Sequence, residues 1–305
     1  MPYPTDEHTY IGRFAPSPTG PLHLGSLFTA LAGFLDARAR QGKWLLRIDD
    51  LDQPRIVSGA TESILKTLET FGLTWDDSIS YQSRHLDGYH HHLETLIKNR
   101  YCYPCICSRK TLADAITPDS TADVYPGFCK GRAIPPDTPS ALRIIANDRI
   151  IAFDDRLQGR IASPLAEQHG DFVIQRKDGI MAYQFAVVID DALHQVNQIV
   201  RGMDLLESTP KQIFLQQILG LATPEYMHVP VMVDRQGYKL SKQTLATAVD
   251  HSHPPAVLFD LLLLLKQNPP SELARTNLSE ILAWAIANWN PEPLKNIKVV
   301  EQKIN

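Results

Sequence analysis

The sequence has few cysteines, no long apolar run and no strong excess of either charge. Its four cysteines, three of them within Cys102 to Cys107, suit a metal site better than a disulfide framework. The densest apolar stretch, Leu258 to Lys266, contains an aspartate and is far shorter than the roughly 20 residues of a membrane-spanning helix. A net charge of -4 neither supports nor excludes a nucleic-acid partner, because a local basic patch can bind phosphate on an acidic protein.

The start of the chain also lacks the features of a secretion signal. The opening residues, MPYPTDEHTY, are polar and contain neither a basic start nor an apolar core. We therefore expect a cytoplasmic protein with no membrane partner. The 305 residues, 44% of them hydrophobic, suffice for one large domain or two ordinary ones with a buried core.

The first third of the chain alternates strand and helix signals. A strand-like run from Tyr10 to Phe14 precedes a Pro/Gly turn, and residues 27–42 then carry apolar side chains at helical spacing until Gly42. A second apolar run follows at 44–50, with further helices expected at 59–71 and 84–99. This order predicts βαβ units and an α/β fold with a doubly wound parallel sheet.

The middle of the chain has a different texture. Between Tyr101 and about Asp171, cysteines, prolines and glycines interrupt any sustained period, and we interpret this interval as an insertion with its own small fold. Beyond it, the apolar run AVVI at 186–189 predicts a buried strand, and residues 210–220 predict a helix closed by Gly220. After about Tyr226 we expect a loop-rich stretch and then helices.

The turn after the first strand is the motif RFAPSPTGPLHLGSL, residues 13–27. A strand that enters a helix through such a turn places the helix N-terminus at the carboxyl edge of the sheet, where phosphates bind. His23, in the first turn, can donate a hydrogen bond to phosphate, and Gly25 leaves the helix face open to a flat ring. An equally good interpretation is that the prolines stiffen a loop and His23 lies on the surface.

A second motif, GYKLSKQT at 237–244, places Lys239 and Lys242 around a serine after a glycine. Such lysines can neutralise the charge that develops on a leaving pyrophosphate. Alone, the motif is more often a solvated basic loop. The two motifs in this order favour a nucleotide site.

These motifs resemble those of a known family. PLHLG resembles the HIGH signature and KLSK the KMSKS signature of class I aminoacyl-tRNA synthetases, and RFAPSPTGPLHLGS is similar to the form in glutamyl-tRNA synthetases. RIDDLDQPR, FGLTWDD and IVRGMDLLESTPKQIFLQQILG extend the similarity. The resemblance implies a Rossmann-like catalytic domain that activates glutamate with ATP and Mg²⁺.

The resemblance also implies a shortened enzyme. Glutamyl-tRNA synthetases carry a helical anticodon-binding region after the second signature, whereas here 61 residues follow Thr244. This form resembles the glutamyl-Q tRNA(Asp) synthetase family, which joins glutamate to the queuosine base in the anticodon of tRNA(Asp). The alternatives are a truncated synthetase that acylates a tRNA 3′ end, an inactive tRNA-binding paralogue, and a nucleotidyltransferase that shares the first helix.

Site residues are carried over from the family position by position. The resemblance implies that His23, Lys239 and Lys242 are catalytic. ATP is expected to contact Pro16, Gly20, His23, Gly25, Ser26 and Lys242. Glutamate is expected to contact Arg13, Ser17, Asp49, Tyr183 and Arg201. Guanidinium groups suit a side-chain carboxylate because they bind it as a fork.

Three of these assignments have open alternatives or a departure from the family pattern. Arg201 can instead form a structural ion pair with Asp204 or Asp191, and Tyr183 can be a buried core residue. Where the family has R-I-E-D, this chain has Asp49, which keeps the charge but is one methylene shorter. A closer backbone, an intervening water or a shifted substrate would each accommodate it.

The cysteines predict a structural zinc site. By number alone, either all four bind the metal, or Cys105, Cys107 and Cys129 bind it with a fourth ligand. The family pattern C-x-C followed by Y-x-x-x-C implies that Tyr125 is the fourth ligand. One alternative is that Cys102 is the fourth ligand, and another is that the thiols bind no metal. The other conspicuous group, His85 and His90–His92, falls on an expected helix, and we interpret it as solvated surface.

The expected organisation follows from these assignments. The first and second halves of the catalytic domain are expected at 9–101 and 172–225, and the zinc-containing insertion at 102–171. Residues 226–305 hold the KMSKS-like loop and a C-terminal helical segment. The expected partners are ATP, L-glutamate and tRNA(Asp) carrying queuosine, bound by a monomer.

Overall fold

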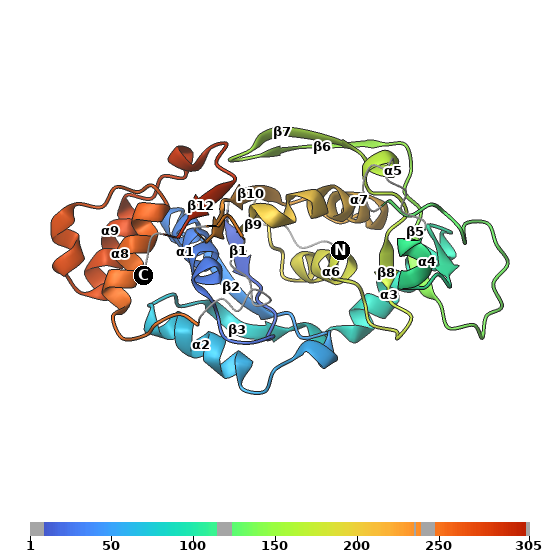
Figure 1. The fold of residues 1–305 in the computed structure, drawn as a ribbon, viewed down its shortest axis with the longest axis horizontal. Coiled ribbons are helices and arrows are strands. Elements are labelled where there is room, and N and C mark those ends of the chain that lie inside the picture. Colours follow the sequence, from blue (N-terminus) through green and yellow to red (C-terminus); the bar gives the residue numbers. More distant parts are fainter. Residues whose placement is uncertain (1–8, 115–123, 235, 239–247, 303–305) are drawn as a thin grey trace.

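The computed structural model describes residues 9–114, 124–234, 236–238 and 248–302. A seven-stranded sheet forms its centre, in the order β3-β2-β1-β9-β10-β6-β7 (Figure 1). Neighbours from β3 to β6 are parallel, and β6 pairs with β7 antiparallel. The predicted α/β fold with a mostly parallel sheet is confirmed. Its strands are β1 (Ile11–Phe14), β2 (Lys43–Ile48), β3 (Asp76–Tyr81), β6 (Ile150–Asp155), β7 (Gly159–Pro164), β9 (Gln198–Gly202) and β10 (Glu225–Val229).

The helices expected in the first third of the chain are present. α1 ends before Gly42, and α2 is followed by Gly72, whose φ of 69° favours glycine. α7 is closed by Gly220, in the left-handed conformation, as predicted. The helices are α1 (Leu24–Ala39), α2 (Ala60–Thr70), α3 (Leu86–Lys98), α4 (Arg109–Ala113), α5 (Leu165–Gln168), α6 (Tyr183–Leu193), α7 (Thr209–Leu219), α8 (Pro254–Leu264) and α9 (Leu278–Ala287).

The strand predicted at 186–189 is wrong, because these residues lie inside helix α6. Every residue from Phe185 to Asp191 is buried, and α6 packs beside α7 and α3. Because this stretch of the helix is buried throughout, its apolar run shows no alternation with a polar face and resembles a buried strand. The strand of this region is β9, which follows the helix.

Residues 102–171 contribute to two sheets. β6 and β7 extend the central sheet, and β6 joins it through the bridge between Asp155 and Tyr226. β4 (Cys102–Cys105) and β5 (Ala141–Ile144) form a three-stranded antiparallel sheet with β8 (Val173–Gln175), which lies beyond the interval. Figure 1 shows this smaller sheet at one end of the molecule, with the β6–β7 hairpin running back towards the centre.

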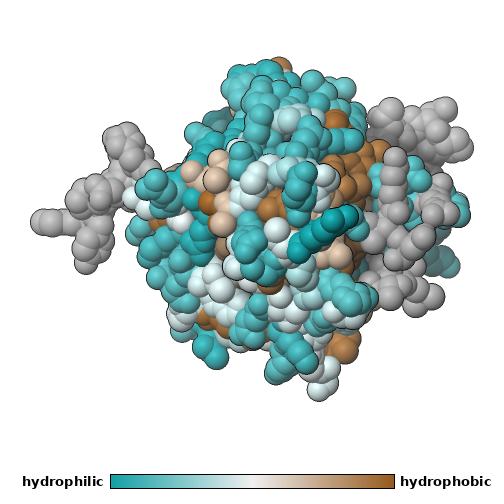
Figure 2. All heavy atoms as spheres, turned by 90° about the vertical axis from the view of Figure 1, so that its left-hand side faces the viewer, coloured by the Kyte–Doolittle hydropathy of each residue, from teal (hydrophilic) through white to brown (hydrophobic). Residues whose placement is uncertain are grey.

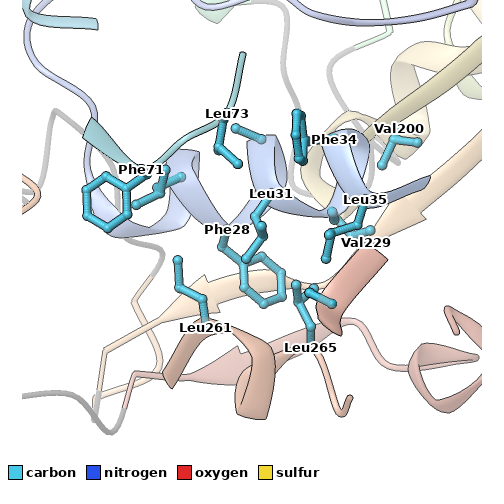
Figure 3. Close-up of a cluster of buried hydrophobic side chains, with 14 of the residues drawn as sticks. Phe28, Leu31, Phe34, Leu35, Phe71, Leu73, Val200, Val229, Leu261 and Leu265 are labelled. Atoms are coloured by element: carbon cyan, nitrogen blue, oxygen red, sulfur yellow. The ribbon is translucent and has the colours of Figure 1, made fainter. Parts of the chain in front are cut away.

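The C-terminal helices α8 and α9 lie at the opposite end, beside α1 (Figure 1). Leu261 and Leu265 point towards Phe28 and Leu31 of α1, so this segment completes the core that covers the first strands (Figure 3). β11 (Val231–Val233) and β12 (Val299–Glu301) pair beside it. Polar residues cover most of this end, and apolar residues gather towards one side of the face (Figure 2).

Within the described ranges, no helix has the length and apolar character needed to cross a bilayer.

Candidate active site and metal centre

Two neighbouring strands at the middle of the sheet end beside a cavity. The chain order reverses between β1 and β9, and ligands of open parallel sheets bind beyond the carboxyl ends of the strands at such a reversal. A cavity of about 310 Å³ lies there, with Phe14 at the end of β1 and Gly202 at the end of β9 in its wall. This volume suits a small-molecule ligand.

Most of the residues singled out in the sequence line this cavity. From the glutamate set they are Arg13, Ser17, Tyr183 and Arg201. From the ATP set they are Pro16, His23, Gly25 and Ser26. Gly20 and Asp49 are not part of its wall, and Lys239 and Lys242 lie outside the described residues. Two groups of residues expected to serve two substrates therefore surround one cavity.

The loop from β1 to α1 is tied to its surroundings by backbone hydrogen bonds. The carbonyl of Pro16 accepts from the N–H of Asp49, and that of Pro18 accepts from Val57, each at 3.0 Å. Gly20 has a φ of 138°, where an L side chain is strained. The turn is thus held at its prolines and bends at its glycine.

His23 is the N-cap of α1 and immediately precedes its first turn, where the sequence predicted it within that turn. Its Nδ1 accepts from the backbone N–H of Ser26 at 3.2 Å, as an N-cap side chain does. Because Nδ1 is the acceptor, the proton of the neutral ring lies on Nε2, which is 3.0 Å from the Ser26 hydroxyl. A ligand phosphate that accepts from Nε2 would therefore take the place of the Ser26 hydroxyl.

Gly25 leaves room for this imidazole. A Cβ at position 25 would lie 3.2 Å from Nδ1 of His23 and 3.5 Å from Cβ of Met232. A side chain here would press on the His23 ring from the helix side. The glycine therefore preserves the ring's position as well as the open helix face.

Arg13 and Arg47 share one carboxylate. Nε of Arg13 donates to Asp191 at 3.0 Å, and Nη1 of Arg47 donates to the same Oδ1 at 2.7 Å. All three side chains are buried. Burial acts to raise the pKa of Asp191, but the two guanidinium charges outweigh it and hold the pKa below its ordinary value. Asp191 thereby fixes Arg13 at the cavity wall.

The neighbouring carboxylate, Asp190, is also buried and bonded. It accepts from Gln82 at 2.7 Å, from the Tyr89 hydroxyl at 2.7 Å, and from Nδ1 of His85 at 2.8 Å. The interpretation of His85 as solvated surface is therefore wrong. His90 and His91, on α3, are exposed as expected.

The sequence did contain a signal for this buried cluster. Asp190 and Asp191 interrupt an apolar run, and adjacent carboxylates inside such a run require buried partners. The alternative pairing of Asp191 with Arg201 is wrong, because Asp191 pairs with Arg13 and Arg47.

Asp49 lies behind the cavity wall. Its carboxylate accepts from Nε of Arg47 at 2.7 Å, and its side chain is almost fully buried. Burial raises the pKa of Asp49 to about 6, against the lowering effect of Arg47 and with a smaller raising effect from Asp190. The shorter side chain is thus directed at a neighbouring arginine.

Arg201, on β9, is buried and held by neutral groups. It donates from Nη1 to Gln212 and from Nη2 to Thr209, each at 2.7 Å, and from Nε to His228 at 3.0 Å. A second N–H of Nη2 donates to the carbonyl of Leu205 at 3.3 Å, so one N–H of Nη1 is left for a ligand. A guanidinium has five N–H donors, so these bonds fix its plane without neutralising its charge. This arrangement suits a cation that awaits an anionic ligand.

Tyr183 begins α6 and is 41% exposed at the cavity. The alternative of a buried core tyrosine is therefore wrong.

Three cysteines form a cluster that could bind a metal. The Sγ atoms of Cys105, Cys107 and Cys129 lie within 4.8 Å of one another, and those of Cys107 and Cys129 are 3.6 Å apart. Two thiolates about 2.3 Å from one zinc in a tetrahedron would be about 3.8 Å apart. The spacing therefore fits a tetrahedral metal ion.

The phenol of Tyr125 adjoins the cluster. Its oxygen lies 3.4 Å from Sγ of both Cys105 and Cys107, and it accepts from the backbone N–H of Cys129 at 2.9 Å. Arg143 stacks on the Tyr125 ring and donates to Sγ of Cys105 at 3.3 Å. Burial and the neighbouring thiols raise the pKa of the Tyr125 phenol above its ordinary value and outweigh the Cys129 N–H, which acts to lower it.

Cys102 lies apart from this cluster. It packs against the core around α6 and α7, and burial raises the pKa of its thiol to about 11. In this position the thiol packs as a small apolar residue.

The chain has extensive similarity to known proteins. Residues 11–271 match the family described as tRNA synthetases class I (E and Q), catalytic domain. The chain is 49% identical over 282 residues to a glutamyl-Q tRNA(Asp) synthetase of Methylococcus capsulatus, covering 92% of this chain and 91% of that protein. It is 45% identical over 282 residues to the protein of the same name from Pseudomonas aeruginosa, covering 92% and 94%.

Solved structures have the same fold. A glutamate tRNA ligase from Elizabethkingia meningosepticum, in complex with its amino acid, matches with a TM-score of 0.78 and 25% identity. The match covers 95% of this chain but 66% of that one. A glutamate-tRNA synthetase from Elizabethkingia anophelis gives a TM-score of 0.79 at the same identity, covering 95% and 68%.

Proposed function

The chain belongs to the class I tRNA synthetases of the glutamate and glutamine (E and Q) family, and from this premise we propose that it is a glutamyl-Q tRNA(Asp) synthetase. In this function, L-glutamate is activated with ATP and then transferred to the queuosine base in the anticodon of tRNA(Asp). The cavity at the end of β1 and β9 carries the first half of this proposal, because arginines and phosphate-binding groups surround it together. The near-full-length similarity to glutamyl-Q tRNA(Asp) synthetases supports the second half.

Glutamate is proposed to bind on the arginine side of the cavity. Among described residues, Nη1 of Arg13 bonds to none, so it can donate to the side-chain carboxylate while Asp191 holds the other edge of the guanidinium. Arg201 supplies a second fixed cation, with Ser17 and Tyr183 as polar contacts. Two such cations favour glutamate over neutral glutamine.

The glutamate ammonium group is assigned to Asp49. Its backbone N–H bonds to Pro16, a residue of the cavity wall, while its carboxylate is directed at Arg47. We propose that a water bridges this carboxylate to the ammonium, because the aspartate is one methylene shorter than the family glutamate.

ATP is proposed to bind at the start of α1. Nε2 of His23 donates to a phosphate oxygen, Gly25 and Ser26 lie against the nucleotide, and the Gly20 turn with Pro16 shapes the loop around it. Lys239 and Lys242 neutralise the departing pyrophosphate. Mg²⁺ bound with ATP would neutralise charge on the phosphate oxygens.

The reaction needs no protein nucleophile. An oxygen of the α-carboxylate of glutamate attacks the α-phosphorus of ATP, and the bond from this phosphorus to pyrophosphate breaks. Glutamyl-adenylate remains in the cavity. Attack by queuosine on the adenylate carbonyl then forms the product and releases AMP. The protein contributes by holding both reactants in register and by stabilising the charge that develops.

A structural zinc ion is proposed in the small sheet, held by Cys105, Cys107, Cys129 and Tyr125. The sulfur spacing and the backbone donor to the phenol oxygen support this ligand set. All four positions would be filled by protein, so the metal would hold residues 102–171 together rather than take part in the chemistry. We further propose that the enzyme acts as a monomer in the cytoplasm, where ATP and tRNA(Asp) are available.

The activation step is tested by exchange of labelled pyrophosphate into ATP. We expect exchange that depends on L-glutamate and is at least tenfold weaker with L-glutamine, because an amide lacks the charge that Arg13 and Arg201 would meet. Equal exchange with both amino acids, or none with glutamate, would contradict the proposal.

A further inference from the structure

His228, on β10, links a buried carboxylate to the cavity arginine. Its Nδ1 lies 2.6 Å from Oδ2 of Asp155, and its Nε2 lies 3.0 Å from Nε of Arg201. His228 is fully buried and Asp155 nearly so. The three side chains form one continuous hydrogen-bonded row from β6 across β10 to β9.

The geometry allows one protonation state of this histidine. Arg201 can only donate through Nε, so Nε2 of His228 must accept and the ring proton must lie on Nδ1, facing the Asp155 carboxylate. A proton on Nε2 would face the N–H of Arg201, and a doubly protonated ring would add a second cation there. Burial and the charge of Arg201 accordingly hold the pKa of His228 below its ordinary value.

Asp155 is itself fixed by backbone donors. Its Oδ1 accepts from the N–H groups of Leu157 at 3.0 Å and Gln158 at 2.9 Å. These two bonds leave Oδ2 directed at His228. The carboxylate therefore selects the ring tautomer, and the tautomer presents an acceptor to Arg201.

We propose that Asp155 and His228 are positioning residues that orient Arg201 for recognition of the glutamate carboxylate. This inference rests on the proposed function. Neither residue is part of the cavity wall, so they act through Arg201. Without the Nε2 acceptor, the buried Nε–H of Arg201 has no partner, and the guanidinium tilts on its remaining bonds to Gln212, Thr209 and Leu205. The one Nη1 N–H left for substrate then moves away from the glutamate carboxylate.

Asp155→Asn tests the tautomer directly. The Leu157 and Gln158 N–H groups retain the amide oxygen at the Oδ1 position. The amide NH₂ then faces both Nδ1 and the backbone N–H of His228, which in the wild type donates to Oδ2 at 3.1 Å. The ring proton then moves to Nε2 and meets Arg201. We expect the KM for glutamate in pyrophosphate exchange to rise about tenfold or more, with the KM for ATP within about twofold of wild type.

Nitrogen NMR supplies a readout that a purely structural role would not move. The His228 ring signals, identified by their loss in His228→Gln, should show protonated Nδ1 in wild type and protonated Nε2 in Asp155→Asn. Asp154→Asn is the matched control: this neighbouring side chain is exposed, and it should leave both the spectrum and the KM for glutamate unchanged.

A pair of variants at position 228 separates positioning from folding. His228→Gln keeps a donor for Asp155 and an acceptor for Arg201, whereas His228→Leu keeps neither. We expect His228→Leu to raise the KM for glutamate about tenfold or more. We expect His228→Gln to keep this KM close to the wild-type value. Unchanged glutamate KM in Asp155→Asn and His228→Leu, or equal rises in the KM for ATP, would overturn the inference. Absence of glutamate-dependent exchange in wild type would instead overturn the proposed function.

Discussion

Asp49 directs its carboxylate at Arg47, whose Nε donates to it at 2.7 Å. The same guanidinium also binds Asp191, so one buried arginine connects the position that departs from the family pattern to the carboxylate that holds Arg13. The difference of one methylene therefore affects a cluster of buried charges as well as one substrate contact.

The pH dependence of stability tests the state of Asp49. Its pKa of about 6 lies above the ordinary 3.8, so the fold favours the protonated form. Its contribution to stability is full below about pH 4 and is lost as the pH rises through about 6. Relative to Asp49→Asn, which cannot titrate, the wild-type free energy of unfolding should fall by about 2 to 3 kcal/mol over this range. Denaturant titrations of wild type and Asp49→Asn at several pH values measure the difference in their free energies of unfolding. A difference that rises with pH or stays constant would refute the raised pKa of Asp49.

Loss of the shared carboxylate should destabilise the fold. Asp191→Ala leaves the buried guanidinium groups of Arg13 and Arg47 without their common partner, and we expect a loss of about 3 to 5 kcal/mol in the free energy of unfolding. Asp154→Ala, which removes an exposed partner of Arg160, should cost less than about 1 kcal/mol. Urea denaturation measures the free energy of unfolding of both variants. Similar losses would show that the buried pairing of Asp191 contributes no more to stability than an exposed ion pair.

A methyl group at Gly25 should impair ATP use without unfolding the protein. In Gly25→Ala the new Cβ presses on the His23 ring, and we expect kcat/KM for ATP to fall about tenfold or more. Gly88→Ala is the matched control on α3, where a Cβ would meet nothing within 4 Å. It should leave exchange unchanged and raise stability by about 0.5 to 1 kcal/mol. Equal exchange rates in both variants would show that the position of the His23 ring does not affect the use of ATP.

Metal content tests the cysteine cluster. Purified wild type should hold about one equivalent of zinc, and Cys105→Ser should hold close to none, since a tetrahedral site rarely keeps its metal with one thiolate fewer. Cys102→Ser should retain one equivalent because this thiol packs in the apolar core. Elemental analysis measures the zinc content of each protein. Loss of zinc in Cys102→Ser, with retention in Cys105→Ser, would reverse the ligand assignment.

The parallel sheet and the helix after the first turn could be predicted because local signals agreed with the tertiary fold. α1 has apolar spacing and a stop at Gly42, and the strands on either side of it are short apolar runs. α6 could not be predicted, because every residue from Phe185 to Asp191 is buried and the apolar run within this stretch carries no helical period.

The candidate site was predicted where family motifs supplied its residues and missed where partners come from distant segments. Arg13 and Arg201 were named from the sequence, but their partners Asp191 and His228 lie 178 and 27 residues away along the chain. No local pattern encodes such pairs. Tyr125 shows the converse, since the motif pointed to the position that the fold places beside the cysteines.

Transfer of glutamate to queuosine is the step that defines the proposed function. The most direct measurement incubates the protein with ATP, labelled glutamate and tRNA(Asp) that either carries or lacks queuosine, and then removes the 3′-terminal nucleotides. We predict that label enters only the queuosine-bearing tRNA and stays with it after the 3′ end is removed. Equal labelling of the unmodified tRNA, or loss of the label with the 3′ end, would contradict the account.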